Sequence, residues 1–110
     1  MELLVFVMNK VDLLDELLMK FSEHSNFRAT VIDSSGMAHI LKDTNLFFGL
    51  RDLLNNSQVN SKTILMALDN KDIMTAVDII ESVVGNLENP DTGIVFTLPI
   101  SYMKGMVKKG

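Results

Sequence analysis

The sequence predicts an α+β domain in which two β-α-β units form a four-stranded antiparallel sheet with two helices on one face. Three observations lead to this fold class. Four short apolar runs predict strands, two segments of helical periodicity lie between them, and a long connection separates the first β-α-β unit from the second. With right-handed crossovers, this order of elements places both helices on the same face of the sheet.

The first predicted unit opens with a continuous apolar run at residues 3–8, which is typical of a strand covered on both faces. Apolar residues then recur at spacings of three and four over residues 11–21, with charged residues between them. This pattern predicts an amphipathic helix. Residues 27–33 predict the second strand, in which Phe27 lies on the same face as the alternate apolar residues that follow it.

A long connection at residues 37–60 joins the two units. Its apolar residues between 46 and 54 are too many for a free loop, so we expect a short helix near residues 45–55. A short strand at residues 44–50 is the alternative.

The second unit repeats the order of the first. Residues 63–68 predict a buried strand, and an apolar stripe over residues 73–84 predicts a helix that stops at Gly85. Residues 87–92 must turn, and the last strand covers residues 93–100. Pro99 interrupts that strand near its end, which favours an edge position because proline cannot donate to a β-ladder.

The predicted strands are apolar on both sides, yet the two helices can cover only one face of the sheet. In a chain this small, the cover expected for the second face is another copy of the same chain. The sequence therefore predicts a homo-oligomer.

Composition limits the function classes. The chain has 110 residues, which fits a single domain over residues 1–110, and 47% of them are hydrophobic. A formal charge of −4 argues against a nucleic-acid partner, because phosphate-backbone binding needs clustered Lys and Arg. The chain has no cysteine, which fits a reducing compartment, and no apolar run reaches the roughly 20 residues that span a bilayer. We therefore expect a cytoplasmic protein without a membrane span.

Motifs for catalysis or metal binding are missing from the sequence. There is no phosphate-binding loop ending in Lys-Ser/Thr, no Gly-x-Ser-x-Gly elbow and no zinc motif. His24 and His39 have no second histidine or cysteine at ligand spacing, so we expect no metal site. The sequence predicts a protein that is not an enzyme.

Three segments resemble the PII signalling superfamily, whose fold is the ferredoxin-like β-α-β-β-α-β arrangement. The run 29–38 (ATVIDSSGMA) resembles the PII strand that leads into the base of the T-loop, and the last strand, 93–100 (GIVFTLPI), resembles the closing strand of the family. Residues 26–30 (NFRAT), followed by Ser35-Gly36, also resemble the cyclic di-AMP receptors of the PII-like group. The resemblance covers nearly the whole chain and rests more on the order of elements than on any single motif.

The resemblance implies a homotrimer that binds a nucleotide effector between subunits and reaches a target protein through a T-loop-like insertion at residues 37–60. Thr30 matches a strand residue that contacts the base, and Gly36 matches the first glycine of the loop base. A guanidinium such as that of Arg28 can hold a phosphate bidentately, and the amides of Thr92 and Gly93 can face an anion. The candidate effector-binding residues are Arg28, Thr30, Gly36, Met37, Thr92, Gly93 and Lys104.

The sequence also departs from the PII pattern. Ala38 stands where the second loop-base glycine is expected, Pro90 replaces a glycine, and Gly93 replaces a lysine of the phosphate-holding loop. Only Lys104 falls near the C-terminal arginine pair. A triphosphate needs several positive charges or amide donors, so we do not expect ATP binding in the usual PII manner. The resemblance of residues 26–30 to the cyclic di-AMP receptors implies a cyclic dinucleotide as the better candidate effector.

Two alternatives remain open at this point. The chain can be a structural or partner-binding trimer that binds no nucleotide. It can also resemble the related divalent-cation-tolerance proteins, although it has no cysteine and no clear carboxylate-histidine cluster.

Overall fold

The computed structural model describes residues 1–37 and 61–105 of the chain. Only Met37 of the 37–60 connection is described, so the helix expected near residues 45–55 and its alternative, a strand at residues 44–50, lie outside the described residues. In chain order, the elements are β1 (Glu2–Met8), the 3-10 turn η1 (Val11–Leu13), α1 (Leu14–Phe21), β2 (Thr30–Ser34), β3 (Ser61–Leu68), the 3-10 turn η2 (Asn70–Asp72), α4 (Ile73–Val84) and β4 (Gly93–Pro99).

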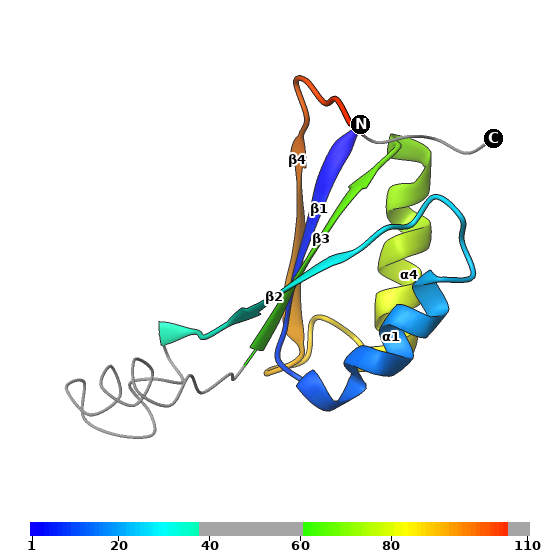
Figure 1. The fold of residues 1–110 in the computed structure, drawn as a ribbon. Coiled ribbons are helices and arrows are strands. Elements are labelled where there is room, and N and C mark those ends of the chain that lie inside the picture. The colour runs from blue at the N-terminus through cyan, green and yellow to red at the C-terminus, as the bar shows by residue number, and fades with distance from the viewer. Residues whose placement is uncertain (38–60, 106–110) are drawn as a thin grey trace.

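The four strands form one antiparallel sheet in the order β2-β3-β1-β4. Of the residues that the structure describes, the two helices α1 and α4 lie on one side of this sheet, and none lies on the other side (Figure 1). This is the predicted ferredoxin-like arrangement, so the α+β fold class is confirmed. The pairing makes β2 and β4 the two edge strands and buries β1 and β3 between them.

The hydrophobic core lies between the sheet and the helices. Alternate residues of β1 and β3 point into it, and each helix contributes residues at helical spacing. Burying a large aliphatic or aromatic side chain stabilises a fold by about 1.5–3 kcal/mol, so this layer supplies most of the driving force for folding. The buried members are Leu4, Phe6, Met8, Leu17, Phe21, Phe27, Ile64, Met66, Leu68, Ala76, Ile80 and Val84.

The second strand begins later than the sequence predicts. It starts at Thr30 rather than Phe27, because Phe27 is used as an anchor for the preceding turn. The Phe27 ring is buried, packs edge-on against Phe21 at 5.9 Å between ring centroids, and stacks on His24 at 4.7 Å. The Phe27 amide donates to the His24 carbonyl, which closes a turn where the prediction placed a strand.

Each helix is preceded by a 3-10 turn, and its N-cap residue, Leu13 in α1 and Asp72 in α4, makes no side-chain cap hydrogen bond. The end of α4 is held by a residue that is distant in sequence. The Lys10 ammonium donates to the Val84 carbonyl at 3.0 Å, and Gly85 follows in the left-handed region with a φ of +94°. A positive group at this end also complements the helix dipole. The predicted helix stop at Gly85 is confirmed.

Candidate functional site

The side of the sheet away from the helices is called the open face here. Strand register and alternation define its members, since side chains of paired residues lie on the same face. None of them is charged. The open face consists of Leu3, Val5 and Val7 of β1, Thr30, Ile32 and Ser34 of β2, Ser61, Thr63, Leu65 and Ala67 of β3, and Ile94, Phe96 and Leu98 of β4.

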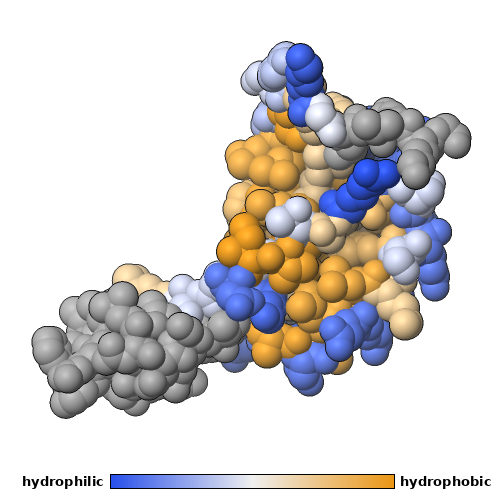
Figure 2. Space-filling model, viewed as in Figure 1, coloured by the Kyte–Doolittle hydropathy of each residue, from blue (hydrophilic) through white to orange (hydrophobic). Residues whose placement is uncertain are grey.

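The part of the open face over β4 is strongly apolar and exposed. Ile94, Phe96 and Leu98 are 58%, 44% and 49% exposed, and Ile32 on the opposite edge strand is 45% exposed. In the space-filling view, hydrophobic atoms reach the surface on the side of the sheet opposite α1 and α4 (Figure 2). Contiguous apolar surface of this kind usually marks an interaction site.

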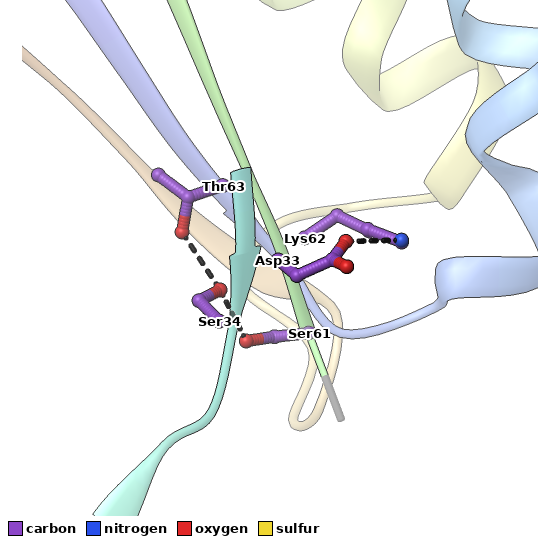
Figure 3. A network of polar contacts seen from close by, with 5 residues as sticks. All are labelled: Asp33, Ser34, Ser61, Lys62 and Thr63. Atoms are coloured by element: carbon purple, nitrogen blue, oxygen red, sulfur yellow. Dashed lines mark hydrogen bonds and ion pairs between the residues drawn. The ribbon is translucent and has the colours of Figure 1, made fainter. Parts of the chain in front are cut away.

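Where β2 ends and β3 begins, the open face is polar. The Ser34 hydroxyl lies 2.7 Å from the Ser61 hydroxyl and 2.9 Å from the Thr63 hydroxyl, so one side chain of β2 bonds to two of β3 (Figure 3). The side chains of these three residues are the hydroxyl cluster. Ser61 is only 2% exposed, so its oxygen depends on this partner. The cluster ties β2 to β3 at the positions that flank the 37–60 connection.

An ion pair lies on the opposite side of the same two strands. The Lys62 ammonium bonds to the Asp33 carboxylate, and both side chains point away from the hydroxyl cluster (Figure 3). The Asp33 side chain is 61% exposed. An exposed pair of this kind contributes little to stability, and it leaves the open face without charge.

Two of the predicted effector-binding residues lie close together along the chain at the start of β2. Arg28 is exposed just before the strand, and Thr30 is the exposed first residue of β2, on the open face. Of the two side chains, the strand register places only that of Thr30 on the open face.

The remaining candidates do not gather at that place within one copy of the chain. Gly36 and Met37 follow the last residue of β2, and Thr92 and Gly93 lie at the start of β4, at the same end of the sheet. The two pairs belong to opposite edge strands, with β3 and β1 between them. Lys104 is exposed beyond the other end of β4. Any single site that uses all of these residues therefore needs more than one subunit.

The fold itself explains the glycine at position 93 and the burial of Thr92, without a bound ligand. Gly93 has a φ of +139°, and a Cβ atom built there would lie 2.4 Å from the Val7 carbonyl oxygen and 2.9 Å from a ring carbon of Phe6. The position thus requires glycine whatever the protein binds. Thr92 as a whole is only 2% exposed, so neither its side chain nor its backbone offers a ligand any appreciable surface.

Sequence reasoning missed the hydroxyl cluster. Ser34 and Ser61 are 27 positions apart, and only the β2–β3 register brings them together. The available signal was the alternation of polar residues at 30 and 34 in the second strand and at 61 and 63 in the third.

The described residues offer no candidate metal centre: within 1–37 and 61–105, no three His, Cys, Asp or Glu side chains group closely enough to hold an ion. Over the same ranges, neither helix has the length and apolarity needed to cross a bilayer.

Comparison with known proteins identifies the fold but no family. No family model and no curated protein matches the chain. Among solved structures, the chain is similar to a functionally unknown protein from Pediococcus pentosaceus ATCC 25745, with a TM-score of 0.62, 15% identity and 96% of each chain covered. At this identity the likeness extends to the fold alone, and it confirms that the whole arrangement of strands and helices occurs in another protein.

Proposed function

We propose that this chain is a PII-like regulatory protein that assembles as a homotrimer, binds a small effector between subunits and relays the effector's presence to a protein partner. The observation that carries the proposal is the open face, which combines exposed apolar side chains with a complete lack of charge. In this proposal the protein is not an enzyme.

A second copy of the chain suits this face for an electrostatic reason. The chain carries a formal charge of −4, so two copies repel each other over most of their surfaces. The open face has no charged side chain, so copies can approach there with the least like-charge repulsion while removing Ile94, Phe96 and Leu98 from water. A closed ring of three such faces leaves none exposed.

The proposed effector site lies at the β2 edge of this face. Thr30 is exposed there and points to the side on which another subunit would pack, and the exposed Arg28 lies two residues before it along the chain. Arg28 offers a bidentate donor for a phosphate and Thr30 a hydroxyl for a base. One guanidinium suits a phosphate of a cyclic dinucleotide better than a triphosphate, and residues 37–60 are the proposed contact to the target protein.

Self-association is tested by light scattering of the purified protein. We expect a particle of three subunits of 12.3 kDa each. Phe96→Glu places a charge on the open face and should lower the mass to that of one subunit. Met74→Glu is the matched control, since Met74 is a 64% exposed hydrophobic residue on α4, away from the open face, and this variant should remain a trimer. A wild-type monomer, or equal masses for the two variants, would refute the assembly.

Effector binding is tested by a thermal-shift screen against ATP, ADP, AMP, cyclic mononucleotides, cyclic di-AMP and divalent metals. A ligand at 100 times its dissociation constant adds about 2.7 kcal/mol of stability. Arg28→Ala should reduce the shift and leave the particle mass unchanged. A persistent trimer with no shift from any compound would replace this proposal by the second candidate, a structural or partner-binding trimer without an effector.

A further inference from the structure

Among residues 1–37 and 61–105, no strand pairs with the second backbone edge of β4. It is the last strand in the order β2-β3-β1-β4, and it runs for seven residues at the margin of the sheet (Figure 1). Edge strands present a row of free N–H and C=O groups to any extended chain of suitable shape.

The register shows which groups of β4 are free. The Ile100 amide donates to the Met1 carbonyl at 3.1 Å, and these two residues continue the β1–β4 pairing in which Glu2 opposes Pro99. In an antiparallel ladder, hydrogen-bonded pairs alternate with unbonded ones. The even-numbered residues of β4 therefore bond to β1, and the N–H groups of Gly93, Val95 and Thr97 point to the free edge.

The two edges of this sheet differ in their protection against unwanted pairing. Natural edge strands are guarded by charged side chains, short length, bulges or proline. The β2 edge is five residues long and carries Asp33. The β4 strand has no charge from Gly93 to Pro99, pairs with β1 without a bulge, and has proline only at its last position. An edge left without such guards suits a pairing function.

We infer that the free edge of β4 binds an extended peptide segment of a partner protein, which adds to the sheet as an antiparallel fifth strand. The choice of a partner protein's peptide, rather than a second copy of this chain, rests on the proposed trimer. Subunits related by a three-fold axis cannot pair β4 with β4, which needs a two-fold axis, and the β2 edge of a neighbour is too short to match β4. A chain from another protein is then the strand that can use the whole edge.

The edge also specifies the chemistry of this segment. The incoming peptide should have about seven residues and no charge in its middle. Its side chains should be alternately β-branched or apolar, so that they continue the row of Ile94, Phe96 and Leu98 on the open face. The turn before β4 carries exposed Glu88 and Asp91. In the antiparallel orientation this turn lies beside the C-terminal end of the incoming strand, so a Lys or Arg there completes the match.

The first test measures amide hydrogen exchange by NMR on the free protein. We expect the amides of Ile94, Phe96 and Leu98 to be protected, because they bond to β1, and those of Val95 and Thr97 to exchange rapidly. Protection of Val95 and Thr97 without any peptide would mean that the edge is already paired with another copy, and would overturn the inference.

The second test adds a probe peptide of alternating Thr and Val, seven residues long, with a C-terminal Lys and blocked ends. We expect binding by fluorescence anisotropy and new protection of the Val95 and Thr97 amides. The same peptide with alternate backbone nitrogens methylated cannot form the ladder and should not bind. Equal binding of both peptides, or no binding of the unmethylated one at millimolar concentration, would overturn the inference.

Two variants probe the edge in opposite directions. Thr97→Pro removes an outward N–H and should weaken peptide binding roughly tenfold, whereas Pro99→Ala supplies the outward N–H that proline lacks and should strengthen it by roughly twofold to tenfold. Pro99→Ala keeps the inference testable if Thr97→Pro fails to fold. Light scattering of the same samples reports the trimer separately, so failure of the edge pairing and failure of the assembly are distinguishable. Unchanged affinity in Pro99→Ala, or unchanged affinity in folded Thr97→Pro, would contradict pairing at this edge.

Discussion

Replacing Gly93 with alanine tests whether this residue is present for the backbone or for a ligand. The residue has a φ of +139°, and an added Cβ would lie 2.4 Å from the Val7 carbonyl oxygen, a backbone atom of the inner strand β1. Neither β1 nor β4 can move away without breaking the ladder between them, so Gly93→Ala must strain the strand.

The expected loss of unfolding free energy in Gly93→Ala has two parts, which a matched control variant separates. Gly85 also has a positive φ, +94°, but a Cβ there meets nothing within 4 Å. Gly85→Ala therefore reports the backbone term alone, about 1 kcal/mol. Gly93→Ala adds the steric clash, and we expect a total loss of about 3 kcal/mol in the free energy of unfolding.

The assay is urea denaturation monitored by far-UV circular dichroism. The slope of the transition is compared between variants, because a shifted midpoint at an unchanged slope reports a change in stability alone. If Gly93→Ala costs no more than Gly85→Ala, the clash at the Val7 carbonyl is not real, and a ligand role for Gly93 becomes the better explanation of the glycine.

Three further substitutions test contacts outside that strand. Lys10→Met removes the ammonium that bonds to the last carbonyl of α4 and should cost about 1 kcal/mol in unfolding free energy. Lys20→Met, the control at an exposed 3.5 Å contact, should change that free energy by less than 0.5 kcal/mol. Equal effects of the two substitutions would contradict the capping role of Lys10. Ser34→Ala breaks both bonds of the hydroxyl cluster and should cost about 2 kcal/mol by thermal denaturation, and a cost near zero would mean that water replaces the serine. Asp33→Asn should change stability by less than 0.5 kcal/mol in low or high salt, because the ion pair is exposed, and a larger, salt-sensitive loss would show that the pair matters.

The fold was predictable because each element has a local signal. Apolar runs gave the strands, the three-and-four spacing gave the helices, and the handedness of β-α-β connections left one arrangement of the sheet. The start of β2 was not predictable in this way. Phe27 has high strand propensity, but its ring contacts Phe21 and His24 across a turn, and tertiary packing of this kind overrides local preference.

The site was less predictable because its determinants join residues that are far apart in sequence. Thr92 and Gly93 look like anion-binding residues in a linear motif, yet Thr92 is buried and Gly93 is required by the Val7 carbonyl of another strand. Residue type alone gives no hint of either fact. The free amides of β4 likewise follow from the β1 register and not from the sequence of β4 itself.

The hydroxyl cluster bears on how much of the open face another subunit can cover. A buried hydroxyl without a partner costs about 1–3 kcal/mol, so a polar patch normally lies outside an interface. Here Ser34 already bonds to both Ser61 and Thr63, so covering the cluster leaves these oxygens with partners inside their own subunit. Desolvation is then inexpensive over the polar part of the face as well as over its apolar part. The internal pairing of the hydroxyls and the absence of charge thus have the same consequence. Apart from Thr30, whose exposed hydroxyl is assigned to the proposed effector, the open face can be buried against another copy without an unpaired polar side chain.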